Sequence, residues 1–210
     1  MAEQWGFMSA QDSHNPVNAI EFVVRQIISR GVCTGMIVKI LSVDAAAKTL
    51  DAQPMVDQVT PDGKSIPHGP IHEIPYGYEQ GGNCQIKLDP VVGDIGVIVF
   101  AHRDITRVKR TWKNATPQTL RAHNIADAMY VRTLVSAATP QHVITFDQQN
   151  GIAISSPLVV KIEADAQITG NLAVGGNVTA GGDVKAGSIS LENHTHSGVQ
   201  AGSGNTGKPQ

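Results

Sequence analysis

Two histidines near the C-terminus, His194 and His196, are the residues whose type and spacing could bind a metal ion. They stand one residue apart in "NHTHSGVQAGSGNTGKPQ", before a tail of small and polar residues that cannot build a core. A closed structural metal site needs about four or more ligands, so one chain supplies too few. Either the pair is solvated and idle, or other chains supply the missing ligands.

A second group of possible ligands, His68, His72 and Glu73, lies in "TPDGKSIPHGPIHEIPYGY". The density of Pro and Gly in this stretch opposes regular structure. The spacing is not that of two histidines on one helical turn, and no further ligand stands close by. We therefore expect an exposed polar loop here rather than a metal site.

The composition of the chain argues against several classes of function. The 210 residues include 41% hydrophobic, 4% aromatic and 16% charged residues, with a net charge of −2. This balance provides no basic field for nucleic acid or an anionic membrane. Cys33 and Cys84 lie far apart without CxxC spacing, so we expect two structural thiols and no disulfide. We see no signal peptide and no apolar run of membrane-spanning length, and expect synthesis in the cytoplasm.

The N-terminal segment, residues 1–32, contains a predicted helix in "NPVNAIEFVVRQIISRG". Asn15 suits the N-cap, Pro16 the first helical position and Gly31 the end of the helix. Glu21 and Arg25 are four residues apart and are expected to pair. The helix either packs on its own domain or docks on a partner or a sister chain. Its apolar stripe consists of Ile20, Val23, Val24, Ile27 and Ile28.

Residues 33–115 predict a small β-barrel. The runs "TGMIVKILSVD", "LDAQPMVDQV" and "GDIGVIVFAHRD" are rich in β-branched residues and read as short strands. An oligonucleotide/oligosaccharide-binding (OB) fold is the natural candidate for such a barrel. Residues 116–141 form a connector that the sequence assigns poorly.

Residues 142–190 alternate between apolar and polar positions. Of the 23 even-numbered positions from 142 to 186, 16 are apolar and none is charged. This period indicates strands with one buried face, and the hexads "GNLAVG", "GNVTAG" and "GDVKAG" add the sharp corners of a β-helix. One chain has too little bulk to fill such an interior, and its apolar residues become smaller toward the C-terminus. We therefore infer a tapering homo-oligomer, and call residues 142–190 the needle and 191–210 the apex.

Several chains around one axis would also complete the histidine site. His194 and His196 point the same way in an extended chain, and three chains would supply six imidazoles. Six nitrogen donors suit octahedral coordination of a first-row metal such as Fe(II) better than tetrahedral zinc. Ile189 and Leu191 are apolar at odd positions, so the register shifts near Gly187, and parity alone leaves the direction of the histidines open.

The succession of these segments resembles the central spike proteins of contractile-tail bacteriophages, also called baseplate assembly protein V or membrane-piercing tail spikes. The most specific part is "HTHSG" with its Gly-rich tail, and "GMIVKILSVD…GDIGVIVF" is similar to the N-terminal barrel of the spike. The resemblance spans most of the chain.

That resemblance implies a mainly β homotrimer with an OB barrel near the tail tube and an intertwined β-helix below it. It implies one iron ion (Fe2+) per trimer, held by His194 and His196 of three chains. It also implies a virion protein of the tail baseplate, bound to a tail tube or hub protein, which pierces the host outer membrane when the sheath contracts. We expect no enzymatic activity, because no catalytic motif is present.

Three other functions fit less well. A trimeric tail fibre that binds a host surface glycan would need aromatic platforms, and only Phe146 is aromatic beyond Tyr130. A hexapeptide-repeat acyltransferase would need many more hexads. A nucleic-acid-binding OB protein would need basic and aromatic residues interleaved, which the sequence lacks.

Overall fold

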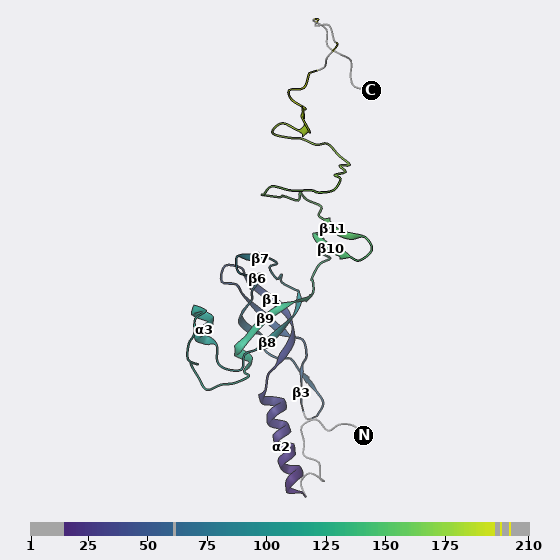
Figure 1. Cartoon of the computed structure of the whole chain (residues 1–210). Helices are drawn as coiled ribbons and strands as arrows, with labels where there is room; N and C mark the ends of the chain where they lie inside the picture. The colour runs from purple at the N-terminus through teal and green to yellow at the C-terminus, as the bar shows by residue number, and fades with distance from the viewer. Residues whose placement is uncertain (1–14, 61, 196–197, 199–201, 203–210) are drawn as a thin grey trace. The chain divides into compact units, whose positions relative to one another are not determined.

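The computed structural model describes residues 15–60, 62–195, 198 and 202. The chain divides into two compact units, Met1–Pro157 and Leu158–Gln210. Strands make up most of the regular structure in the described residues, as expected for a mainly β chain (Figure 1).

The predicted N-terminal helix is confirmed as α2, Pro16–Gly31. The Asn15 side chain accepts a hydrogen bond from the Val17 N–H at 3.0 Å and so caps the helix. Arg25 donates to Glu21 at 2.6 Å, as the spacing predicts. The apolar stripe of α2 is exposed and is not packed on the sheet of the same chain.

Five antiparallel strands form the main sheet in the order β5-β2-β1-β8-β9. The two edge strands β5 and β9 also contact each other, so the sheet curls on itself. The strands are β1 (Gly35–Asp44), β2 (Thr49–Pro54), β5 (Ile71–Pro75), β8 (Ile95–Phe100) and β9 (Ala128–Val135).

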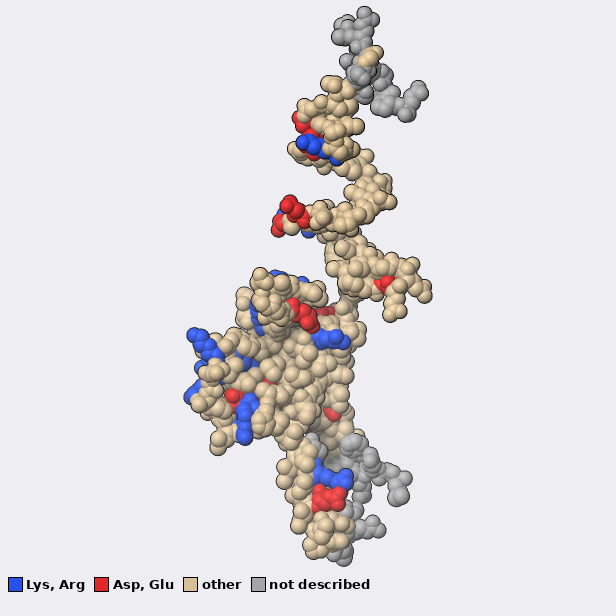
Figure 2. All heavy atoms as spheres, in the orientation of Figure 1, with Lys and Arg blue, Asp and Glu red and all other residues tan. Residues whose placement is uncertain are grey.

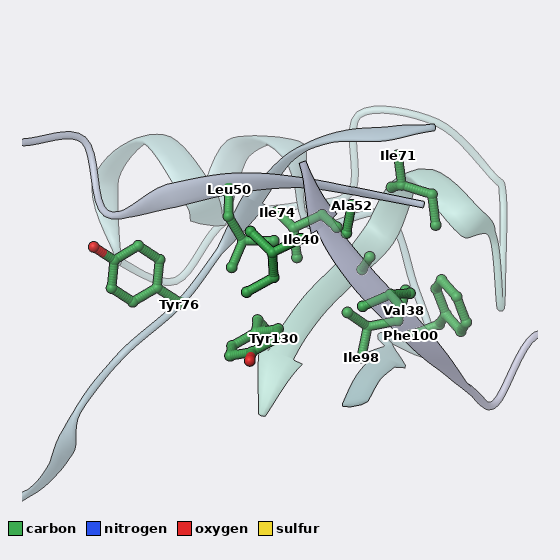
Figure 3. Packing of buried hydrophobic residues seen from close by; sticks show 11 residues of the cluster. Val38, Ile40, Leu50, Ala52, Ile71, Ile74, Tyr76, Ile98, Phe100 and Tyr130 are labelled. Atoms are coloured by element: carbon green, nitrogen blue, oxygen red, sulfur yellow. The ribbon is translucent and has the colours of Figure 1, made fainter. Parts of the chain in front are cut away.

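The core lies inside this curled sheet, because alternate residues of β2 and β8 point inward (Figure 3). Gly96 allows one close approach, since a Cβ atom there would lie 2.4 Å from the Tyr130 ring. The buried apolar residues are Val38, Ile40, Leu50, Ala52, Ile71, Ile74, Tyr76, Ile98, Phe100, Ala128 and Tyr130.

The chain also forms smaller elements outside the main sheet. Two short hairpins are formed by β3 (Gln58–Val59) with β4 (Ser65–Ile66) and by β6 (Glu79–Gly81) with β7 (Cys84–Ile86). The segment between β8 and β9 carries helix α3 (Thr106–Thr111) and the 3-10 helix η1 (Ile125–Asp127). Lys and Arg side chains gather around α3 (Figure 2).

Strand β9 lies in the segment 116–141, for which the sequence predicts only a connector. It pairs with β8 over six residue pairs, from Ile95 with Val135 to Phe100 with Ala128. The buried Asp94 carboxylate accepts hydrogen bonds from the Ala137 N–H at 2.7 Å and the Val91 N–H at 3.0 Å. The sheet therefore extends beyond residue 115, and the Asp94 carboxylate holds the chain in place just after β9.

The single chain forms strands only near the two ends of the needle. These are the hairpin of β10 (Val143–Asp147) with β11 (Gly151–Ser155) and that of β12 (Lys185–Ala186) with β13 (Ile189–Ser190). Residues 156–184, all of which are described, contain no strand. The chain bends at 169–170, 175–176 and 181–182, where each predicted hexad begins.

Candidate metal centre and assembly surface

The β10–β11 hairpin shows the predicted alternation directly. Ile144 pairs with Ile154 and Phe146 with Ile152. Residues directly opposite each other share one face of an antiparallel pair, so these four side chains form one apolar face. The Asp147 carboxylate fixes the turn by accepting hydrogen bonds from the Gln149 and Asn150 N–H groups at 2.9 and 2.7 Å.

This apolar face is exposed in the single chain, and so are the even-numbered apolar positions that follow it. Their side chains are between 46% and 77% exposed. An isolated two-stranded hairpin is marginally stable at best, and exposed apolar surface of this extent marks an interaction site. The residues concerned are Ile144, Phe146, Ile152, Ile154, Leu158, Val160, Ile162, Ile168, Leu172, Val174, Val178 and Val184.

The β12–β13 hairpin explains the register shift predicted near Gly187. Gly187 has φ +62, a left-handed conformation that glycine adopts without strain. The turn has two residues, so Ala186 pairs with Ile189, and the Leu191 N–H donates to the Val184 carbonyl at 2.9 Å. An even-numbered residue therefore lies opposite an odd-numbered one, and the apolar face continues through Ile189 and Leu191.

His194 follows this hairpin in a tight backbone turn. Its N–H donates to the Ser190 carbonyl at 3.1 Å, and its ring Nδ1 lies 2.9 Å from the same oxygen and 3.2 Å from the Leu191 carbonyl. A carbonyl oxygen only accepts, so Nδ1 carries the proton and the lone pair of the neutral ring is on Nε2. Histidines that bind metals commonly donate their other ring N–H to a backbone carbonyl in this way.

His194 is the apex histidine that the structure describes, and its Nδ1 contacts two backbone carbonyls. His196 lies outside the described residues. Within the described part of the chain, no group of three or more His, Cys, Asp or Glu residues could hold a metal ion.

The residues of the second candidate group, His68, His72 and Glu73, contact other residues rather than one another. His72 Nδ1 lies 3.1 Å from an oxygen of the Asp51 carboxylate, whose other oxygen accepts the Glu73 N–H at 3.0 Å. His68 Nδ1 lies 3.1 Å from the Gln58 side-chain nitrogen. The two histidines thus contact different partners, and His72 and Glu73 lie in strand β5 rather than in the exposed loop expected from the sequence.

A third pair of histidines, His102 and His123, was not expected from the sequence. His102 Nδ1 lies 2.8 Å from His123 Nε2, with the rings edge to face at 4.7 Å between centroids. The His123 carbonyl also accepts the Cys33 N–H at 3.1 Å. The two histidines are 21 positions apart in the sequence, so no local pattern signals this contact.

A charged cluster between β8 and β9 was also missed. Arg121 Nη2 donates to Asp104 at 2.9 Å, and its Nε donates to Asp127 at 2.7 Å, while both carboxylate side chains are fully buried. Hydrogen bonds, of which that with the Thr106 side chain contributes most, hold the pKa of Asp104 well below its ordinary value. Burial alone would raise the pKa of Asp127, but hydrogen bonds from Arg121 and the Ile105 N–H lower it. The cluster therefore fixes the α3 segment against the sheet.

Comparison with known families points to the same class of protein. The model of the N-terminal domain of phage protein Gp138 matches residues 36–133, and the model of the GpV apex motif matches residues 188–210. No curated protein matches the chain. The matched segments contain the five-stranded sheet up to Thr133 and the region of both apex histidines.

These matches identify the phage central spike (gpV-like) protein family, so the resemblance drawn from the sequence is confirmed. They support a structural protein of the phage tail spike, with a place in the virion. No helix in the described residues is both long enough and apolar enough to span a membrane.

Proposed function

We propose that this chain forms a homotrimeric needle at the tip of the phage tail, which pierces the host outer membrane when the sheath contracts. The observation that carries the proposal is the exposure of the apolar residues of the needle, both the four on one face of the β10–β11 hairpin and the even-numbered ones from Leu158 to Val184. On a single chain these residues are in water, whereas around a three-fold axis they would form a shared core.

In this proposal the curled sheet is an OB barrel that joins the needle to the tail tube or hub protein. The strand order β5-β2-β1-β8-β9 and the contact between β5 and β9 support a closed five-stranded barrel. The boundaries 33–115 and 116–141 do not coincide with this sheet, because β9 belongs to it.

The needle would be an intertwined β-helix. Residues 156–184 contain no strand in the single chain, and strands of the neighbouring chains would supply ladder partners. The regular bends allow each chain to pass around the axis and return with the same face inward. Closure around the axis would also remove the exposed strand edges that promote aggregation.

The apex would be closed by one iron ion held by His194 and His196 of three chains. The Nδ1 contacts of His194 support this site, since histidines that bind metals commonly make such contacts and since they hold the ring in place. The ion would supply cross-linking rather than reactivity, because six protein nitrogens would fill an octahedral shell. The narrow end would thereby be held together where apolar burial is least.

The proposal contains no catalytic step. The matched families are structural phage proteins, which favours a protein that acts mechanically. A continuous ladder of hydrogen bonds between chains would make the needle stiff, and a closed apex would leave no strand end to fray under load.

The experiment is metal analysis of the purified, untagged protein together with its mass in solution. The double variant His194→Ala/His196→Ala is compared with His68→Ala/His72→Ala, a control called the loop variant, which removes one histidine of the loop before β5 and one of β5 itself. We expect a trimer with roughly one iron per three chains in the native protein and in the loop variant. The apex variant should remain trimeric and lose the iron.

Two results would contradict the proposal. A monomer would exclude the trimeric needle. A trimer that keeps its iron after loss of both apex histidines would place the metal elsewhere and remove the apex site.

A further inference from the structure

Helix α2 carries an apolar stripe that the proposed needle does not use. Its valines and isoleucines are between 46% and 69% exposed. The helix precedes residue 36, so it lies outside both segments that the family models match. The residues of the stripe are Val17, Ile20, Val23, Val24, Ile27 and Ile28.

The spacing of this stripe is that of a coiled coil. Val17 and Val24 occupy successive a positions, and Ile20 and Ile27 occupy the d positions between and after them. β-branched side chains at d oppose a two-stranded coiled coil, and β-branched residues at both a and d shift the preference to three or more strands. The sequence of the helix therefore selects a higher-order bundle over a dimer.

The flanking positions agree with this assignment. Val23 falls at g and Ile28 at e of the next heptad, the two positions that meet across neighbouring helices of a parallel coiled coil. Both side chains are apolar and exposed, which widens the face that each helix can bury against two neighbours. The charged pair Glu21–Arg25 is satisfied within the helix, at 2.6 Å.

We propose that the occupant of the stripe is the same helix of the two other chains, so that three copies of α2 form a parallel bundle. This inference rests on the proposed trimer, which would hold the three helices near one another at high effective concentration. A helix of 16 residues is marginal in isolation, so the bundle would also stabilise α2 itself. Contacts between the three helices would then hold the trimer together independently of the apex metal.

The test is disulfide formation between chains in the full-length protein. Ile20→Cys and Val24→Cys are each introduced into a Cys33→Ala/Cys84→Ser background, so that each chain carries one thiol. The matched control is Arg25→Cys, because the Arg25 side chain is 78% exposed on the other side of the helix. Each preparation is oxidised gently, its covalent dimers are followed on a non-reducing gel, and its mass in solution is measured beforehand.

We expect the two stripe variants to form covalent dimers on the order of tenfold faster than the control, since only a and d positions bring Cβ atoms within disulfide distance. Equal rates in all three variants, with a trimeric mass, would overturn the bundle and leave the proposed trimer standing. A monomeric mass of the parent protein would overturn both. Failure of only one stripe variant to cross-link would contradict the a and d assignment.

Discussion

Arg121 stabilises two buried carboxylates at once. The Asp104 and Asp127 side chains are fully buried, and the guanidinium group between them is 29% exposed. Thr119 adds an N–H and a hydroxyl hydrogen bond to Asp104 at 2.9 and 2.7 Å. Removing the cation would leave two buried negative charges without their main partner, which is far more costly than losing a surface ion pair.

This cluster should make the stability of the sheet domain sensitive to acid. The pKa values of Asp104 and Asp127 are lowered in the folded chain, so their stabilising contribution is complete above the unfolded pKa of about 3.9 and falls as the pH decreases below it. We expect Arg121→Met to reduce the free energy of unfolding at pH 7 by about 3 kcal/mol. The variant should also lose less stability than the native protein between about pH 5 and pH 2.

Urea unfolding followed by tryptophan fluorescence at several pH values measures both effects. Arg103→Met is the control, because Arg103 is an exposed residue of the same segment. This control should change the stability by no more than about 0.5 kcal/mol. Equal acid sensitivity in the native protein and in Arg121→Met would show that the cluster does not set it.

For single residues, the sequence predicts which side chains could bind a metal ion but not which groups those side chains contact. His194 and His196 are recognisable because their spacing is local. The contacts of His194 with the Ser190 and Leu191 carbonyls arise from a backbone turn that no residue pattern signals. Arg121 and Asp104 are 17 residues apart, so their pairing depends on how the α3 segment folds back.

Among the elements, the β10–β11 hairpin gives the sharpest test of the assembly surface. Phe146→Ser/Ile152→Ser replaces one cross-strand pair of the exposed apolar face. In the proposed trimer this pair is buried, so each large-to-small change would cost about 3 kcal/mol per chain. We expect the double variant to lower the melting temperature of the needle and to shift the mass toward monomer on dilution.

The control pair lies on the opposite face of the same hairpin. Thr145→Ser/Ala153→Ser changes residues that pair with each other and should leave the trimer intact. An identical response of both double variants, measured by light scattering over a dilution series, would indicate that the even-numbered face is not the buried one.

Local patterns predict α2 well. Asn15, Pro16 and Gly31 mark its ends, and the cap, the first helical position and the last residue all agree with the structure. Strands β1, β2 and β8 coincide with β-branched runs, whereas β5 lies in the Pro- and Gly-rich stretch for which the sequence predicts a loop. Strand β9 was missed because "AMYVRTLV" follows a long irregular segment, and its place in the sheet comes from pairing with β8 rather than from its own sequence.

For the molecule as a whole, the proposed trimer predicts two unfolding events. Calorimetry of the full-length protein should show one transition for the sheet domain, which has its own core, and another for the needle, which contacts between chains would hold together. Arg121→Met should lower only the first transition. Removal of the proposed iron ion with a chelator should lower only the second, because metal binding stabilises the folded site it occupies.

Protein concentration provides an internal control. The transition of the needle should rise with concentration, as expected when unfolding separates chains, and that of the sheet domain should not. A single concentration-independent transition that both perturbations shift equally would show that the chain unfolds as one monomeric unit.

The bends that recur every six residues, at 169–170, 175–176 and 181–182, have a consequence for how such proteins diversify. Because side chains alternate with a period of two, gain or loss of one whole hexad keeps every later residue on the same side. A change of five or seven residues would instead move every later side chain to the opposite face of its strand. Recombination between these similar glycine-containing segments could therefore lengthen or shorten the spike in steps, without redesign of either the sheet domain or the apex.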